Sequence, residues 1–302
     1  MELIKPGSKI PFTRYRYIAI GISSVVNLLV LVLLFTKGPL LGVDFAGGTV
    51  AQLKFTKPVS IPEIRNALGE LGAGDTVIQD FGQEGSNEFL VRLQRTSVQL
   101  GELGEQIKAR LGKQFGSDGF EVRRIESVGP KVGAELRQRG TWSVIAATVM
   151  MGIYIWLRFE LRFGLGAVVA LVHDVLVTIG ALIIANYEFD LTIIAALLTV
   201  VGFSVNDTVI ICDRVRENMR KIKRESLETI INTSINETLS RTIITTGTAI
   251  LVLLALFLLG GGVIQPFAFA LLVGFFSGVY STIFIASPVV LLWEKRAVAK
   301  KQ

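Results

Sequence analysis

Long apolar windows dominate this sequence and limit the kinds of structure it can form. About 20 predominantly apolar residues are needed to cross the roughly 30 Å of hydrocarbon in a bilayer. Windows of this kind occupy residues 17–35, 141–157, 163–186, 191–212, 243–260 and 264–293. Only 19% of the 302 residues are charged, against about 25% in soluble proteins. We therefore expect a polytopic α-helical membrane protein with six transmembrane helices.

Lysine and arginine are distributed unevenly around these windows. Basic residues precede the first window, separate the second from the third and the fourth from the fifth, and follow the sixth. The short connections at 187–190 and 261–263 contain none. The positive-inside rule then predicts that both termini are cytoplasmic. The same uneven distribution explains the net charge of +6. We therefore expect these basic residues to lie against membrane lipid and not to bind nucleic acid.

A segment of different composition separates the first two windows. It is polar and of mixed charge, and its length suits one small domain outside the cytoplasm. The expected organisation has three parts: residues 1–41 with the first transmembrane helix, the domain at 42–140, and helices two to six at 141–302.

The domain alternates between strand and helix patterns. Period-two alternation and turn residues predict strands at 49–55, 76–81, 88–93 and 120–125. Ser60 and Glu63 form a capping box that begins a first helix, and apolar spacing predicts a second helix over 100–111. The order βαββαβ is ferredoxin-like, a fold that hosts many functions. The segment shows no metal cluster and no catalytic motif, so we expect binding or mechanical coupling and no enzymatic activity.

One aspartate lies inside the fourth window. An aspartate at the centre of a membrane helix costs roughly 2.5–3.5 kcal/mol, and such residues are functional by default. Asp207 is therefore the main candidate, with Ser204 on the same helical face and Asn206 and Thr208 beside it as supporting residues. The alternatives are a carboxylate permanently paired to hold helices together, or one that reaches headgroup water.

Further ionisable residues lie in the apolar windows or just before them, among them His173, Asp174 and Arg241. Asp174 follows His173 in the third window, and adjacent helical residues point to different faces, so they are not expected to form a relay. A proton role and a structural hydrogen-bonding role both remain open for Asp174. Arg241 opens the fifth window, where the sequence alone favours an arginine that extends to the interface. Residues 225–239 are expected to form an interfacial helix before this window.

Glycines gather where the domain joins the membrane and in the last window. Residues 42–48 include Asp44, Gly47 and Gly48, and residues 127–133 include Gly129 and Pro130. Glycine adopts backbone angles that other residues resist, so these junctions are candidate hinges, and ordinary loops are the alternative. In the sixth window, Gly274 and Gly278 form a small-xxx-small pair that permits close approach of another helix.

These motifs, in this order, resemble the SecD/SecF family of bacterial protein-export membrane proteins, and within it the SecF members. The resemblance is carried by Asp44–Gly48 after the first helix, Val128–Pro130 before the second, His173-Asp174, Asn206–Thr208 and Asp213–Asn218. It implies a member of the RND superfamily in the bacterial inner membrane. Such a member pairs with SecD, associates with the SecYEG translocon and uses the proton-motive force to assist preprotein translocation.

The resemblance also implies roles for two residues. Asp207 and Arg241 occupy the positions tied to proton conduction, with protons as the coupling ion and no cofactor. Burial favours the neutral carboxyl and a nearby guanidinium favours the charged one, so movement of Arg241 would load and release a proton. Two alternatives remain: a small-molecule or lipid exporter of the same superfamily, and a purely structural translocon subunit. A single outside domain of about 100 residues is small for an exporter that collects drugs.

Overall fold

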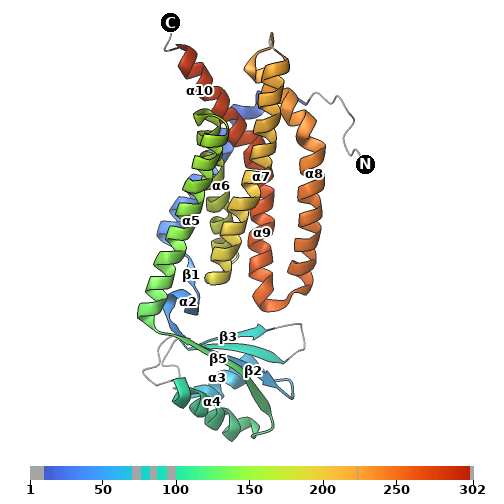
Figure 1. Ribbon diagram of the computed structural model, residues 1–302. Coiled ribbons are helices and arrows are strands. Elements are labelled where there is room, and N and C mark those ends of the chain that lie inside the picture. The colour runs from blue at the N-terminus through green and yellow to red at the C-terminus, as the bar shows by residue number, and fades with distance from the viewer. Residues whose placement is uncertain (1–9, 70–75, 82–86, 94–99, 223, 300–302) are drawn as a thin grey trace.

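A bundle of long helices stands on a small α+β domain in the computed structural model, which describes residues 10–69, 76–81, 87–93, 100–222 and 224–299 (Figure 1). Within those residues, six helical segments are long and apolar enough to cross a membrane. They are α1 (Arg16–Thr36), α5 (Pro130–Arg158), α6 (Leu161–Ile184), α7 (Leu191–Lys221), α8 (Leu227–Leu259) and the segment Ile264–Trp293. The predicted polytopic helical architecture is therefore confirmed.

Two membrane helices extend further into the polar sequence than expected. α5 begins at Pro130, with Gly129 as its N-cap, so residues 130–140 form a helix continuous with the second span. Proline suits the first helical turn, where its missing N–H has no partner to lose. The separate interfacial helix expected at 225–239 does not form, because α8 runs unbroken from Leu227. Both polar segments lack the apolar signal of a span, yet nothing in them ends a helix.

The last membrane segment is irregular. It comprises α9 (Gly261–Ser281), a π-helical turn η3 (Thr282–Ala286) and α10 (Ser287–Ala299). Pro288, the second residue after this turn, has no N–H for the carbonyl of Phe284, four residues earlier. The π turn therefore lies where a regular hydrogen-bond ladder cannot continue.

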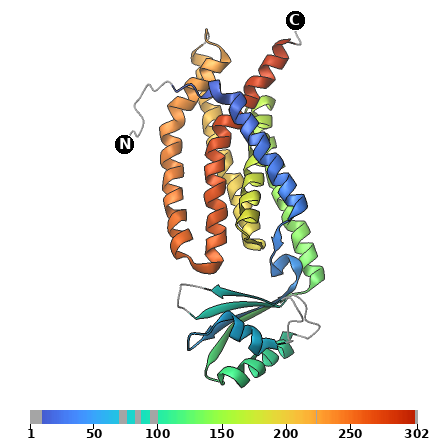
Figure 2. The same cartoon turned by 180° about the vertical axis from the view of Figure 1, so that it is seen from behind.

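α9 lies at the centre of the bundle, in contact with α6, α7 and α8. The predicted small-xxx-small pair makes these contacts close. A Cβ atom built at Gly274 would lie 2.2 Å from Cγ2 of Val200, and one at Gly278 would lie 3.3 Å from Cβ of Ser204, both on α7. The pair therefore serves packing inside the bundle. α1 crosses the outside of the bundle (Figure 2) and contacts α6.

The domain follows the predicted chain order. Its elements are β2 (Gly48–Phe55), α3 (Ile61–Leu68), β3 (Thr76–Phe81), β4 (Glu88–Leu93), α4 (Leu100–Phe115) and β5 (Phe120–Val128). The strands pair antiparallel in the order β3-β4-β2-β5. Both helices cover the sheet face that points away from the bundle (Figure 1), and Leu53, Ile64 and Ile107 are buried between the layers. The capping box forms, with Ser60 N–H donating to Glu63 Oε2 at 2.8 Å.

Two short elements were not predicted. β1 (Leu40–Leu41) pairs in parallel with β6 (Glu188–Phe189), and α2 (Val43–Ala46) forms a single turn inside the first glycine-rich junction. Segments of two to four residues are too short to show a hydrophobic period. Their position is set by tertiary contacts between the junction and the connection from α6 to α7.

The packing of α9 on α7 predicts the effect of one added methyl group. Val200 is stiff about χ1, so Gly274→Ala should overpack this contact and destabilise the bundle by about 1–3 kcal/mol. A Cβ atom placed at Gly21 on α1 would have no heavy atom within 4 Å, so Gly21→Ala should be neutral or stabilising by up to about 1 kcal/mol. Thermal unfolding of the purified protein in detergent checks both. Equal melting temperatures for the two variants would contradict the assigned packing.

Candidate functional site

Asp207 is enclosed between α7 and α8. It is 2% exposed, and its Oδ2 atom accepts a long hydrogen bond from Thr246 Oγ1 at 3.4 Å. Its Oδ1 atom has no hydrogen-bond partner among the described residues, and neither has the buried hydroxyl of Thr242, one turn earlier on α8. An unpaired buried polar atom is costly, so this carboxyl keeps an acceptor oxygen free at a structural cost.

Arg241 stands at the edge of this site. It is exposed on α8, five residues before the Thr246 that bonds to Asp207, and the described part of the chain shows no ion pair between Arg241 and Asp207. Of the threonines around it, only Thr246 bonds to another helix; Thr245 donates to the carbonyl of Arg241 at 2.9 Å. The structure thus brings Asp207 and Arg241 near each other without joining them.

Asp174 has the opposite environment. Its side chain on α6 is fully buried, at 0% exposure. Ser277 donates to Oδ1 at 2.6 Å, and Ser204 and Ser281 each donate to Oδ2 at 2.7 Å. Both carboxyl oxygens are therefore occupied, and the residue ties α6 to α7 and α9. Ser204, which we expected to support Asp207, donates its hydroxyl hydrogen bond to Asp174 on α6.

His173 points away from Asp174, as expected for adjacent helical residues. Its Nδ1 atom lies 3.1 Å from Asn27 Oδ1 on α1. The hydroxyl oxygen of Tyr280 on α9 lies 3.0 Å from Ser23 Oγ, and the same hydroxyl donates to the carbonyl of Ala19. These contacts fasten α1 to the bundle and do not connect the histidine to either carboxyl.

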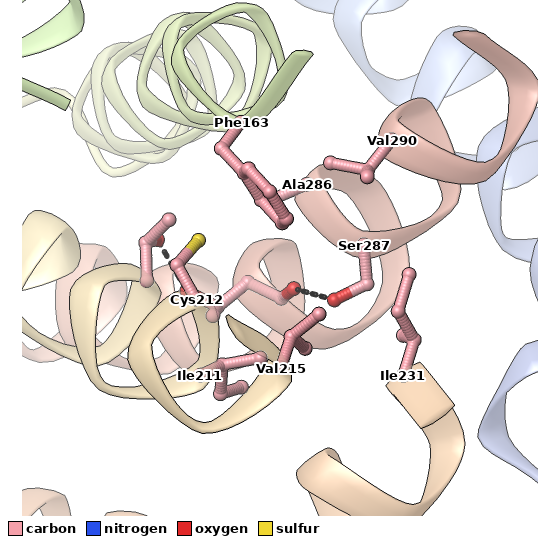
Figure 3. Close-up of a pocket in the computed structure, with 10 residues that line it drawn as sticks. Phe163, Ile211, Cys212, Val215, Ile231, Ala286, Ser287 and Val290 are labelled. Carbon is pink, nitrogen blue, oxygen red and sulfur yellow. Dashed lines mark hydrogen bonds between the residues drawn. The ribbon is translucent and has the colours of Figure 1, made fainter. Parts of the chain in front are cut away.

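The other two supporting candidates lie on different faces of α7. Asn206 is exposed. Thr208 is buried, and its hydroxyl lies 3.0 Å from Thr282 Oγ1 in the π turn. It borders a small pocket whose walls are mostly apolar, including Phe163, Cys212 and Val290 (Figure 3). Ser287 donates to the Thr282 carbonyl at this pocket, at 3.0 Å.

The two glycine-rich junctions pack directly on each other. Gly47 has φ = 77°, and a Cβ there would lie 2.8 Å from Cα of Pro130. A Cβ at Gly133 would lie 3.1 Å from the carbonyl oxygen of Phe45. Backbone meets backbone at both positions, so only glycine fits at position 47, and a larger residue at position 133 would push the two junctions apart. Gly48 also has a positive φ, at 131°. The hinge role of Gly47, Gly48, Gly129 and Pro130 stays a prediction.

Sequence reasoning missed most of the hydrogen-bond partners. The described residues contain no cluster of three or more His, Cys, Asp or Glu that could hold a metal ion. The partners are hydroxyl residues: Ser277 and Ser281 for Asp174, Thr246 for Asp207 and Thr282 for Thr208. The available signal was the spacing of Ser277 and Ser281, four residues apart on one face of an apolar helix.

Comparisons with known proteins identify the family. A family model described as protein export membrane protein SecD/SecF, C-terminal, matches residues 107–296. A second, the SecD/SecF GG motif, matches residues 32–59, which include Asp44, Gly47 and Gly48. The chain is 45% identical over 295 residues to protein translocase subunit SecF of Desulfurispirillum indicum, covering 96% of this chain and 93% of that protein. It is also 45% identical to the SecF subunit of Calditerrivibrio nitroreducens, covering 97% and 96%.

Solved structures agree in fold. The crystal structure of SecDF, a translocon-associated membrane protein from Thermus thermophilus, superposes with a TM-score of 0.83 at 33% identity, over 96% of this chain. A SecDF structure in the super-membrane-facing form gives a TM-score of 0.74 at 33% identity. This chain spans 39% of the length of the first SecDF chain. One family model covers more than half of this chain, and relatives at 45% identity cover nearly all of it. The chain therefore belongs to the SecD/SecF family of protein-export membrane proteins.

Proposed function

We propose that this chain is a SecF-type, non-enzymatic subunit of the Sec export machinery. It works with SecD and uses the proton-motive force to assist preprotein translocation through SecYEG, with protons as the coupling ion. The observation that carries the proposal is the environment of Asp207: a carboxyl 2% exposed, with one oxygen free of partners among the described residues and Arg241 nearby but not bonded. The family relationship supplies the export context.

The proposed cycle needs only two groups of this chain. With Arg241 at a distance, burial disfavours the charged carboxylate and Oδ1 of Asp207 takes up a proton. When the guanidinium approaches, it stabilises the carboxylate and the proton leaves. Asp174 takes no part in this cycle as we propose it, because hydroxyl donors already occupy both of its oxygens.

Exposed polar groups on α7 and α8 support a partner within the membrane. Asn206 and Arg241 are both exposed on membrane-spanning helices. Polar and charged side chains facing lipid are costly, so a second protein covering this face would lower that cost. We propose that SecD is that protein and that the two subunits together form a twelve-span unit with related halves.

The domain has the βαββαβ order and is proposed to be a ferredoxin-like unit outside the cytoplasm of the bacterial inner membrane. η1 (Phe12–Tyr15) and α10 lie at the end of the bundle away from the domain (Figure 1). This arrangement supports cytoplasmic termini, together with the charge bias of the connections.

The orientation is tested by thiol labelling. In a Cys212→Ala background, Asp118→Cys in the domain should react with an impermeant thiol reagent added to intact cells stripped of their outer membrane. Glu225→Cys, between α7 and α8, should react only after the cells are opened. Both positions are exposed in the structure. Labelling in the reverse order would overturn the proposed orientation.

The proton role is tested at Asp207. Asp207→Asn keeps the size of the side chain but cannot ionise, so this variant should assemble with SecD and lose the export stimulation that depends on the proton gradient. ATP-driven export should remain. Asp207→Glu should keep part of the stimulation, and Arg241→Lys should be partly defective because an ammonium lacks the planar fork. The measurement is preprotein uptake into inverted vesicles with and without an uncoupler. Full uncoupler-sensitive stimulation in Asp207→Asn vesicles would favour a purely structural subunit.

Asp174 provides a contrasting test. Asp174→Asn keeps a carbonyl acceptor for the serine hydroxyls, so we expect it to retain most of the uncoupler-sensitive stimulation. Asp174→Ala leaves the hydroxyls of Ser204, Ser277 and Ser281 without this acceptor, at about 1–3 kcal/mol for each buried group that finds no other partner. That variant should melt at a lower temperature. If Asp174→Asn abolished the stimulation at unchanged stability, Asp174 would belong to the proton pathway.

A further inference from the structure

The connection between α6 and α7, residues 185–190, is one of the places where the domain meets the bundle. Arg92 of β4 forms an ion pair with Glu188 of this connection, and their side chains are only 15% and 16% exposed. Strand β3 of the same sheet also contacts α9. An ion pair with this little exposure is costly to break, because either charge left alone would stay largely shielded from water.

A second contact comes from the chain that leaves α1. β1 pairs in parallel with β6, with Leu40 opposite Glu188 and Leu41 opposite Phe189. The N–H of Gly42 then donates to the carbonyl of Phe189 at 2.7 Å. A Cβ at Gly42 would lie 3.0 Å from this same oxygen, so the glycine permits the close approach.

A third contact fixes the first turn of α7. Asp190 is the N-cap and accepts from the N–H of Ile193 at 2.8 Å. Asp44, from the glycine-rich junction, accepts from the N–H of Leu191 at 3.1 Å. Two carboxylates from distant parts of the sequence therefore hold N–H groups that the helix itself leaves unpaired. Burial raises the pKa of Asp190 and the charge of Asp44 adds to this, while the Ile193 N–H opposes it.

The helix fixed in this way is the one that carries Asp207. Sixteen residues separate Leu191 from Asp207 in an uninterrupted helix, which is about 24 Å at 1.5 Å per residue. We propose that the α6–α7 connection is a mechanical joint between the domain and α7, and that Asp44, Arg92 and Glu188 are positioning residues for the Asp207 cycle. The role of this joint in the Asp207 cycle rests on the proposed function. Its contacts can be tested without measuring export.

A charge exchange tests the ion pair within the full complex. Glu188→Arg places two cations together, and uncoupler-sensitive export stimulation should fall at least fivefold while ATP-driven export remains. The double variant Arg92→Glu with Glu188→Arg restores opposite charges and should recover at least half of the stimulation. The control is Glu105→Arg, which disrupts an exposed pair with Lys108 on α4, the helix on the far side of the sheet. It should leave the stimulation unchanged.

Amide hydrogen exchange tests the joint independently of export. In the complex with SecD, Asp44→Ala should speed exchange of the Leu191 amide about fivefold, the factor expected for loss of a helix cap. Asp44→Asn retains an acceptor oxygen and should stay within twofold of the unchanged protein. It should also keep the stimulation, whereas Asp44→Ala should lose at least half of it.

The outcomes separate the joint from the proposed function. Full stimulation in Glu188→Arg, or no recovery in the double variant, would overturn the joint, as would unchanged Leu191 exchange in Asp44→Ala. If Asp207→Asn kept full stimulation, the proposed function would fail, and the exchange measurement would still decide whether these contacts fix α7. If Glu188→Arg failed to assemble, the Asp44 variants would decide the matter through the same two measurements.

Discussion

Hydrogen bonding to one buried carboxyl group holds the centre of this bundle together. In a bilayer, helices gain little from burying apolar surface against each other, since the lipid is equally apolar. What remains is close packing and polar contact between helices. Asp174 receives hydroxyl groups from α7 and α9, and the glycines of α9 bring the helices near enough for those short side chains to reach. The other membrane helices are arranged around this tie.

Among the described residues, the two buried acidic side chains of the bundle, Asp174 and Asp207, differ in how many fixed hydrogen-bond donors surround them. Asp174 has a hydroxyl donor for each oxygen and no exposure, so its environment offers no vacant contact. Asp207 has one weak donor and one unoccupied oxygen among the described residues, and it lies near the long, flexible side chain of Arg241 at the exposed edge. The same type of side chain therefore has two different hydrogen-bonding environments on neighbouring helices, because the number of fixed donors around it differs.

Sequence patterns predicted the features that depend on composition and short-range period. Apolar length gave the spans, alternation gave strands such as Gly48–Phe55, and Ser60 with Glu63 gave a helix start. The errors arose where polar residues continue a helix, as at Pro130 and through the first turns of α8. For the site, the free-energy cost of placing a carboxyl group inside a membrane helix was the only signal that indicated Asp174 and Asp207. Which of them Ser204 serves depends on its side-chain direction and on the distance between helices, and neither is written in residue spacing.

The π turn at Thr282–Ala286 has a consequence for what the last membrane segment can do. A π turn takes one more residue than an α-helical turn, so everything beyond it is rotated by about 100° relative to an uninterrupted helix. Before the turn, Ser277 and Ser281 face the Asp174 carboxyl. After it, the buried side chains include Ser287, Val290 and Leu291, and α10 packs against α6. Because of this rotation, the residues that face the bundle before and after the turn do not follow one helical period. Those before it offer hydroxyl groups to the carboxyl, and those after it offer mostly apolar side chains to the neighbouring helices.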